Sequence, residues 1–499
     1  MQKIKQIITI IISFCSVIMT YGQTTYLPAL WFRISQDSIL LQNINRNAAD
    51  DISTESLSSK LRKSSINAYP AIEFDSISGH FSFTTDSLNG AKQFVVMVVY
   101  QSEKPDSMLG IWSLRNTDKK SFYLTGNKIG NANSQISYNI FDEQGVIVNT
   151  SVFVVDKKAT EIEGSDSLRI GSANNLEFKG KIAEFIVFKN NVSKNERRQW
   201  QTYLSLKYAS TMRYDDYISS WGDTLWCYKE NEAYSKGIAG LGRDDYFGLN
   251  QHQSHAAEDS LAIGIDGIYL QHKNVLKDKD FLMWGHNGGA LSPDGLSYYY
   301  QDSIPIEIEA RKWMVKSHFI SNIIYPTVVQ RSFDTEENAA KACLLINPSE
   351  YFGTWLNNTE IYLPDSISEN KAFFKNIIWN VDGRDRNYFA FGYTKDNTLL
   401  NDPKSKNTIS EIKKVFTEAS WQPNPVVDNL YVSYKLTRDA KIWFTVHNNV
   451  GVPVCQVAPS NKKTGYNETI ISMGHLIRGS YTVYIHVDDM VMAQTVIKK

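Results

Sequence analysis

The chain has 499 residues, which at about 150 residues per domain corresponds to roughly three domains. Lys and Arg together number 52 and Asp and Glu number 53, so the formal charge of -1 argues against a broadly basic nucleic-acid binder and against an acidic tail. Hydrophobic residues make up 42% and charged residues 21%, so the chain can bury cores and is not globally disordered.

Residues 1–22 have the pattern of an export signal. Two lysines precede an almost entirely apolar run over residues 7–19, and Thr20 and Gly22 then place small residues at the -3 and -1 positions before Gln23. A transmembrane anchor is the alternative, but a run of this length falls short of the roughly 20 residues of a membrane span. We therefore expect cleavage between Gly22 and Gln23, an exported protein, and no transmembrane segment in the mature chain.

Cleavage would leave three widely spaced cysteines, which do not form a disulfide framework: Cys227, Cys343 and Cys455. Export makes a disulfide chemically feasible, and Cys227 with Cys343 is the conceivable pair. Buried free thiols are the favoured interpretation.

Nearly all of the mature chain is predicted to be β. Residues 94–100 form a continuous apolar run, which is typical of a strand buried on both faces. Short runs punctuated by glycines follow it, as in a sandwich or jelly roll. The further strands predicted in this region span residues 121–124, 135–141, 146–155, 168–170 and 182–188.

One helix is predicted over residues 193–209. Ser193 and Glu196 have the spacing of a capping box, in which each side chain accepts a hydrogen bond from an otherwise unpaired backbone N–H. Apolar residues at helical spacing then give the helix one buried face, formed by Trp200, Tyr203, Leu204 and Tyr208. We expect this helix to lie across the end of a sheet and to be structural.

The same region carries a resemblance. The segment G-K-I-A-E-F-I-V-F at 180–188, E-R at 196–197 and Y-L-S-L-K-Y at 203–208 resemble the end of a concanavalin A-like, laminin G-like domain of bacterial surface proteins. The resemblance implies that residues 23–212 form a two-sheet jelly roll. Domains of this family often bind glycans or matrix proteins, sometimes through calcium, so calcium is the one cofactor the resemblance suggests.

Residues 213–395 resemble an uncharacterised β domain that commonly follows such lectin-like domains in secreted bacterial proteins. The matching segments are G-L-G-R-D-D at 240–245, R-K-W-M-V at 311–315 and Y-F-A-F-G at 388–392. The resemblance implies export and a surface location, but no known chemistry.

Residues 396–420 are polar and are predicted to be a linker. Residues 421–499 resemble the C-terminal sorting domain of the type IX secretion system, through Pro423-Asn424-Pro425, the Asn449-Val450-Gly451 turn, Leu476-x-x-Gly479-x-Tyr481 and the closing Lys498-Lys499. This implies an immunoglobulin-like β-sandwich, a Gram-negative source, and an outer-membrane secretion translocon as partner. An ordinary fibronectin-like sandwich is the alternative. The predicted strands span residues 430–436, 441–447, 480–487 and 491–497.

Five residues are candidates for ligand contact. Trp221, Trp226 and Tyr228 could stack on sugar rings, although such residues in β proteins are more often core or cross-strand partners. Asp244 and Asp245 could bind a cation, but side-chain to backbone hydrogen bonds that fix a turn are favoured.

No recognisable catalytic set is present. Glu73 and Asp75 lie on one face of a predicted strand, where a glycosidase pair could in principle sit, but solvated strand carboxylates are favoured. The sequence contains no H-E-x-x-H, G-x-S-x-G or P-loop motif. We therefore expect an exported, all-β binding or adhesion protein whose jelly roll contacts a glycan or a protein. A polysaccharide hydrolase with an unfamiliar site and a structural surface-layer component are the alternatives.

Overall fold

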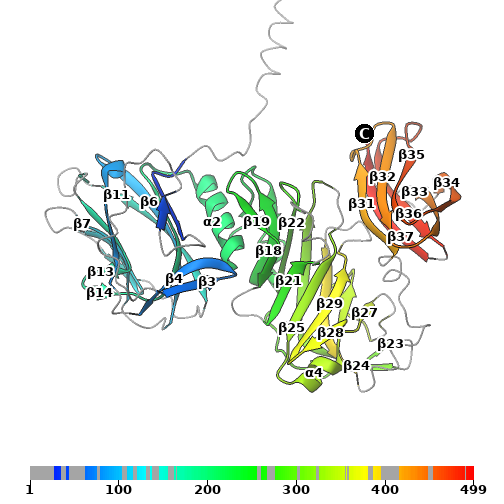
Figure 1. The fold of residues 1–499 in the computed structure, drawn as a ribbon, viewed down its shortest axis with the longest axis horizontal. Coiled ribbons are helices and arrows are strands. Elements are labelled where there is room, and N and C mark those ends of the chain that lie inside the picture. The colour runs from blue at the N-terminus through cyan, green and yellow to red at the C-terminus, as the bar shows by residue number, and fades with distance from the viewer. Residues whose placement is uncertain are drawn as a thin grey trace, which may run out of the picture.

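The computed structural model describes residues 27–34, 41–43, 62–75, 79–103, 109–115, 121–130, 135–137, 145–155, 162–163, 166–255, 260–266, 276–300, 304–321, 325–354, 356, 359–379, 386–394, 415–447, 453–488 and 490–499. These residues form three two-sheet β-sandwiches in chain order (Figure 1). The predicted all-β fold is confirmed. The predicted cleavage site at Gly22 and Gln23 lies outside the described residues.

The first sandwich packs a 7-stranded sheet against a 6-stranded sheet. The larger sheet has the order β11-β6-β15-β1-β2, with β4 paired to β15 and β3 paired to β4. Its strands are β1 (Leu30–Ile34), β2 (Leu41–Asn43), β3 (Arg62–Ile66), β4 (Tyr69–Asp75), β6 (Gln93–Ser102), β11 (Val146–Val154) and β15 (Lys179–Phe188). The smaller sheet has the order β10-β9-β8-β7-β12-β5. Its strands are β5 (Phe81–Thr84), β7 (Gly110–Arg115), β8 (Ser121–Thr125), β9 (Lys128–Gly130), β10 (Gln135–Ser137) and β12 (Ser167–Ile170). A short hairpin of β13 (Ser172–Ala173) and β14 (Leu176–Glu177) and a 3-10 turn, η2 (Asp86–Leu88), complete this unit.

Strand β6 is buried on both faces, as its apolar run predicts. Phe94, Val96 and Val98 point into the core between the two sheets. Val95 and Met97 point the other way, into a second core that includes helix α2 (Lys194–Tyr208). The run is continuously apolar because successive side chains on a strand serve opposite faces, and both faces here are covered.

Helix α2 begins at the predicted capping box. The Ser193 hydroxyl accepts a hydrogen bond from the Glu196 backbone N–H, and the Glu196 carboxylate accepts one from the Ser193 N–H. The helix ends at Ala209, whose φ of 52° places it in the left-handed region. Trp200, Leu204 and the other predicted face residues are buried, which confirms the predicted apolar face.

The second sandwich packs an 8-stranded sheet against a 5-stranded sheet. The larger sheet has the order β19-β18-β22-β24-β30-β26-β27, with β23 paired to β24. Its strands are β18 (Lys236–Asp244), β19 (Leu249–Gln251), β22 (Phe281–His286), β23 (Tyr298–Tyr300), β24 (Ile304–His318), β26 (Ala342–Asn347), β27 (Glu360–Tyr362) and β30 (Arg386–Tyr393). The smaller sheet contains β20 (Gln253–His255), β21 (Leu261–Ile265), β25 (Thr327–Ser332), β28 (Ser366–Ser368) and β29 (Lys371–Ile377). Shorter elements are β16 (Tyr217–Ile218), β17 (Thr224–Trp226), the 3-10 turn η3 (Glu232–Tyr234) and α4 (Glu336–Lys341).

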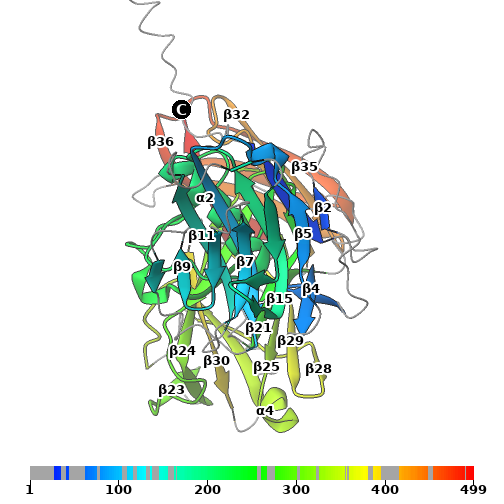
Figure 2. The ribbon, with the colours of Figure 1, turned by 90° about the vertical axis from the view of Figure 1, so that its left-hand side faces the viewer.

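The first two sandwiches share a hydrophobic core. Helix α2 lies between the outer face of the first sandwich and the 8-stranded sheet of the second (Figure 1). Val95 and Ile186 contribute from the first sandwich, whereas Phe247, Phe281 and Met283 contribute from the second. Viewed from the side of the first sandwich, the second extends below it towards α4 (Figure 2). The two units are therefore packed through buried apolar surface.

The third sandwich starts earlier than predicted. Residues 416–420 were expected in the linker, but they belong to β31 (Phe416–Gln422), which pairs with β32 and places Phe416 opposite Leu436. Phe416 is buried and stacks on Tyr434 with ring centroids 4.6 Å apart. The polar residues around it concealed this edge strand, because only its inward side chains are apolar.

A 3-stranded and a 4-stranded sheet form the third sandwich, with the orders β31-β32-β35 and β34-β33-β36-β37. Four of its strands match those predicted: β32 (Asn429–Leu436), β33 (Ala440–His447), β36 (Gly479–Val487) and β37 (Met490–Lys498). Besides β31, two strands were not predicted: β34 (Pro453–Lys462) and β35 (Gly465–Ser472). Among their described side chains only Ile471 is fully buried, so neither strand has a continuous apolar face. The predicted turn at 449–451 lies outside the described residues.

Candidate functional site

A buried charged cluster lies beneath helix α2 and joins it to strand β15. The Glu184 carboxylate is fully buried and accepts hydrogen bonds from the Lys207 ammonium at 2.9 Å and from the Tyr208 hydroxyl at 2.8 Å. The Tyr203 hydroxyl donates to the same carboxylate at 3.0 Å. The polar residues of the I-A-E and Y-L-x-x-K-Y segments thus meet at one point. We call this group, together with Arg33, the Glu184 cluster.

Arg33 links the Glu184 cluster to the second sandwich by hydrogen bonds. Its guanidinium donates to Glu184 at 3.1 Å, to the Tyr203 hydroxyl at 2.7 Å and to the backbone carbonyl of Phe247 at 2.9 Å. Burial by itself would raise the pKa of Glu184, but the Lys207 ammonium and the Arg33 guanidinium outweigh it and lower that pKa to about 2. Since the carboxylate is buried and its partners are protein groups, the cluster is structural.

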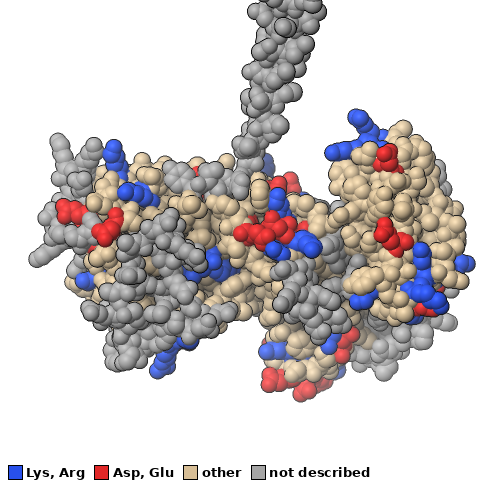
Figure 3. All heavy atoms as spheres, turned by 45° about the horizontal axis from the view of Figure 1, so that its top comes forward, with Lys and Arg blue, Asp and Glu red and all other residues tan. Residues whose placement is uncertain are grey.

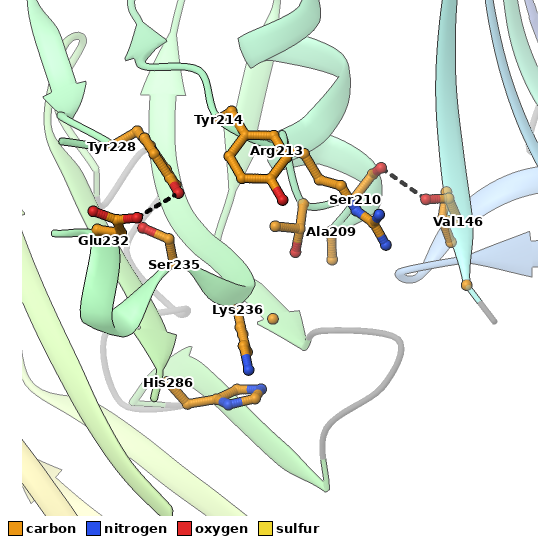
Figure 4. Close-up of a pocket in the computed structure, with 13 residues that line it drawn as sticks. Val146, Ala209, Ser210, Arg213, Tyr214, Tyr228, Glu232, Ser235, Lys236 and His286 are labelled. Carbon is orange, nitrogen blue, oxygen red and sulfur yellow. Dashed lines mark hydrogen bonds between the residues drawn. The ribbon is translucent and has the colours of Figure 1, made fainter. Parts of the chain in front are cut away.

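An open cleft lies where helix α2 ends, at the junction of the first two sandwiches (Figure 4). It has a volume of about 530 Å³. Strand β11 borders it from the first sandwich through Val146, whose carbonyl accepts a hydrogen bond from the Ser210 hydroxyl at 2.7 Å. The residues that follow α2, the segment around η3 and the end of β22 form the remaining walls. The Glu184 cluster fixes the last turn of α2, and so it fixes one wall of the cleft.

Tyr214 is the most unusual side chain in this cleft. Its φ of 57° lies in the left-handed region, which is unfavourable for a bulky residue. Its side chain is nonetheless 77% exposed, so burial of the ring does not offset this cost. Tyr214 meets Tyr228 edge to face with ring centroids 5.5 Å apart, and the Tyr228 hydroxyl donates to Glu232 at 3.2 Å. One face of the cleft is therefore aromatic and held in place by neighbouring groups.

The opposite side of the cleft is rich in hydrogen-bond donors. Lys236 and His286 are cross-strand partners on β18 and β22, and Figure 4 shows the Lys236 ammonium beside the His286 ring. The Gly288 backbone N–H donates to His286 Nδ1 at 2.9 Å, so the neutral imidazole carries its proton on Nε2. A Cβ atom at Gly288 would lie 2.5 Å from Lys236 Nζ, so this glycine leaves room for the lysine side chain. Arg213 adds a second cation to the lining.

Of the five residues that the sequence offers as candidates for ligand contact, only Tyr228 lines the cleft. Trp226 is completely buried, and its indole N–H donates to the Ser235 hydroxyl at 3.4 Å, so no ring face is available for a sugar. Trp221 is half-buried, and the Lys279 ammonium covers its ring at 3.7 Å from the centroid. Both tryptophans thus serve packing.

Asp244 and Asp245 have local structural roles. The buried Asp244 carboxylate accepts hydrogen bonds from the Ser220 N–H at 3.0 Å and the Ser220 hydroxyl at 2.7 Å. Burial raises the pKa of Asp244, and the Ser220 hydrogen bonds oppose this rise. Asp245 is exposed and forms an ion pair with Arg243 at 2.6 Å. The Asp244 carboxylate thus fixes backbone N–H groups, as the favoured interpretation expects, whereas the Asp245 carboxylate pairs with a side chain.

The two strand carboxylates considered for glycosidase chemistry lie away from the cleft. Glu73 and Asp75 are on β4, where their cross-strand partners in β15 are Lys181 and Lys179. Neither contributes to the cleft lining.

Within the described residues, no group of three or more His, Cys, Asp or Glu side chains has an arrangement that could hold a metal ion. Calcium binding thus stays an implication of the family resemblance alone. Cys227, Cys343 and Cys455 are free thiols, and burial raises the pKa of Cys343 to about 12.

The sequence did not reveal four residues of the cleft: Arg213, Tyr214, Lys236 and His286. Arg213 and Tyr214 come a few residues after the K-Y segment, but such a residue pair after a helix carries no signal for binding. Lys236 and His286 are brought together only by the pairing of β18 with β22. A pattern search along the chain cannot detect such a cross-strand pair.

Comparison with known proteins gives little functional information. A family model described as a domain of unknown function (DUF8202) matches residues 196–384, which include the lining of the cleft apart from its edge at β11. No curated protein matches the chain.

Several solved structures are similar over most of the chain, but at low identity. One is dimeric latent PorU from Porphyromonas gingivalis, with 10% identity, a TM-score of 0.17, and coverage of 88% of this chain and 34% of that chain. This chain therefore spans about a third of the PorU chain. Another is the binding domain of botulinum neurotoxin DC in complex with rat synaptotagmin II, with 11% identity, a TM-score of 0.26, and coverage of 94% and 98%. A biofilm-associated protein BSP domain has 8% identity, a TM-score of 0.16, and coverage of 90% and 79%. TM-scores this low do not establish a common fold or function.

No helix among the described residues has the length and apolar character needed to span a membrane.

Proposed function

We propose that this is an exported binding protein and that its ligand is a glycan held in the cleft between the first two sandwiches. In this proposal the ligand site lies at the junction, on a rigid base formed by the shared core. It differs from the expectation that the jelly roll alone contacts the ligand, because most of the cleft lining follows α2 in the chain.

Tyr214 is the observation that carries the proposal. An exposed aromatic side chain in a strained backbone conformation contributes little to folding, so a binding role gives a physical reason for its presence. An aromatic ring presents a flat apolar face that a sugar ring can cover, and the polar groups beside it can bind hydroxyls. Tyr228 supports the ring from one side, so little conformational freedom would be lost on binding.

The remaining features of the proposal concern delivery. The apolar N-terminal run and the small residues before Gln23 support export, and the motifs of residues 421–499 support recognition by a type IX translocon in a Gram-negative bacterium. The resemblance of residues 23–212 to concanavalin A-like, laminin G-like domains supports a glycan ligand. Deleting the third sandwich from residue 415 onward should leave the first two sandwiches folded but in the periplasm. Arrival of that truncated protein at the cell surface would contradict the sorting proposal.

The binding proposal is tested by removing the Tyr214 ring. Tyr214→Ala should weaken binding to polysaccharides roughly tenfold or more in isothermal titration of the mature chain, which corresponds to about 1.4 kcal/mol. Tyr466→Ala is the matched control, because Tyr466 is 72% exposed but lies on the third sandwich. Equal affinities of the wild type and Tyr214→Ala would refute the cleft as the binding site.

A further inference from the structure

We infer that the ligand of this cleft is an anionic polysaccharide, one whose sugar rings carry carboxylate or sulfate groups. The inference rests on the proposed function, and it adds the chemical class of the ligand. It is argued from the charges that line the cleft and from the partners of the carboxylates around it.

The cleft lining contains two cationic side chains. Arg213 and Lys236 both line it, and both side chains are exposed. Within the described residues, Lys236 Nζ has no hydrogen-bond or ion-pair partner. An exposed ammonium that lies across the cleft from the aromatic side chains is a ready donor for a ligand oxygen, and a charged acceptor would bind it more strongly than a neutral hydroxyl would.

The carboxylates nearby are already engaged by protein groups. Asp216 accepts a hydrogen bond from the Tyr228 N–H at 2.7 Å, and Asp215 forms an ion pair with Arg198. Glu230 pairs with Arg386 at 2.7 Å. Glu232, the carboxylate in the lining itself, accepts the Tyr228 hydroxyl. The arginine partners offset the charges of Asp215 and Glu230, whereas neutral donors do not cancel those of Asp216 and Glu232. The lining itself sets Arg213 and Lys236 against Glu232, a formal excess of one positive charge.

The positive character of the cleft is local. The chain as a whole has a formal charge of -1, and on the face shown in Figure 3 side chains of both signs are interspersed. General attraction between a basic protein and any polyanion therefore does not account for binding here. Selectivity for anionic groups would have to come from the lining residues themselves.

The arrangement also favours a polymer over a small anion. Neither cation is enclosed, since Lys236 and Arg213 both face solvent, so a free ion would exchange its hydration for few contacts. A sugar ring on Tyr214 would add apolar contact, and its charged substituent would reach the cationic side of the cleft. The open ends of the cleft would let the chain of a polysaccharide continue past the site.

The inference is tested by titrating the full mature chain with anionic and neutral polymers, of which polygalacturonate and its carboxyl-reduced form are matched in backbone. Polygalacturonate, alginate and chondroitin sulfate are the anionic probes, and carboxyl-reduced polygalacturonate and dextran are the neutral ones. At least one anionic probe should bind, and binding should weaken at least tenfold when its carboxylates are reduced or when Lys236 is replaced in Lys236→Gln. Lys229→Gln is the matched control, because this exposed lysine is close in sequence but does not line the cleft. It should bind as the wild type does, and Lys236→Arg should restore most of the lost affinity.

The outcomes separate the inference from the proposed function. If neutral polymers bind as tightly as anionic ones and Tyr214→Ala still abolishes binding, the proposed function stands and the anionic ligand is wrong. If an anionic polymer binds but Lys236→Gln binds it as tightly as the wild type does, Lys236 does not recognise the charged groups of the polymer and the inference is wrong. If no polymer binds, or if Tyr214→Ala binds normally, both proposals fail.

Discussion

The Lys207 ammonium lies 2.9 Å from the Glu184 carboxylate, so the last turn of helix α2 is tied by a buried ion pair to the strand that precedes it in the chain. The two residues are 23 positions apart and belong to the two halves of the segment that resembles laminin G-like domains. That segment therefore has a structural explanation. Its residues Glu184, Tyr203, Lys207 and Tyr208 form a buried hydrogen-bonded cluster. None of the four lines the cleft.

Removing the charge at the centre of the Glu184 cluster should be strongly destabilising. Glu184→Gln leaves the buried Lys207 ammonium and the half-buried Arg33 guanidinium without their counter-ion, which we expect to cost about 3–5 kcal/mol in the free energy of unfolding. Chemical denaturation followed by tryptophan fluorescence measures this loss. In Glu230→Gln, which breaks the exposed pair with Arg386, the loss should be about 1 kcal/mol or less. Similar losses in the two variants would contradict the role of the cluster.

Acid should weaken the same contact. The pKa of Glu184 is lowered to about 2 in the folded protein from an ordinary value of 4.5. A carboxyl group with a lowered folded pKa stabilises the fold above its unfolded pKa, and this contribution is lost as the pH falls through the folded pKa. Stability should therefore drop between about pH 4.5 and pH 2. In the Glu184→Gln variant this part of the pH dependence should be missing. If stability falls between pH 4.5 and pH 2 as it does in the wild type, Glu184 is not its cause.

Trp200 should be among the most costly side chains to truncate. It is 1% exposed and packs at the junction against Trp31 and Phe247, with ring centroids 4.9 and 4.7 Å away. Trp200→Ala should lower the free energy of unfolding by about 3–5 kcal/mol, because a large buried ring leaves a cavity. As a control, Trp443→Ala removes a half-buried ring from the third sandwich and should cost about 1 kcal/mol or less.

The boundary of the third sandwich can be tested with two fragments. Residues 415–499 include the whole of β31 and should fold alone, whereas residues 421–499 lack the buried Phe416 and Ala419 and leave β32 without most of its neighbour. Circular dichroism and thermal unfolding of the two fragments would show the difference. A cooperative transition of equal midpoint in both would place the boundary at 421 after all.

Relief of backbone strain at Tyr214 should increase stability while binding is lost. Glycine adopts a φ of 57° without the steric cost that tyrosine bears, so Tyr214→Gly should raise the free energy of unfolding by up to about 1 kcal/mol. Differential scanning calorimetry and the polysaccharide titration, done on the same sample, test both effects. A clear loss of stability would mean that the exposed ring has a structural role instead.

Local patterns predicted the elements of this fold well, because burial leaves a periodic trace in the sequence. The run at 94–100 and the box formed by Ser193 and Glu196 appear in the structure as a doubly buried strand and a capped helix. Strands β34 and β35 left no such trace, since only Ile471 among their described side chains is fully buried.

The cleft could not be predicted in the same way. Its lining combines residues that are adjacent only through strand pairing and through the docking of α2, such as Val146 with Ser210 and Lys236 with His286. Trp221 and Trp226 were only candidates for stacking on sugar rings, and both pack against protein groups. Packing was already the favoured interpretation, because a large aromatic ring in a β protein is buried more often than it is displayed. Exposure and backbone strain, which distinguish Tyr214, are visible only in three dimensions.

The core shared by the first two sandwiches bears on how such chains evolve. A recombination breakpoint between them would expose Val95 and Ile186 of the first sandwich to solvent. It would likewise expose Phe247 and Met283 of the second. Each half would then expose a broad apolar surface and aggregate. Descendants that keep one half should therefore keep both, so that the pair is inherited as a single block, while the sandwich beginning at Phe416 can be exchanged between unrelated proteins.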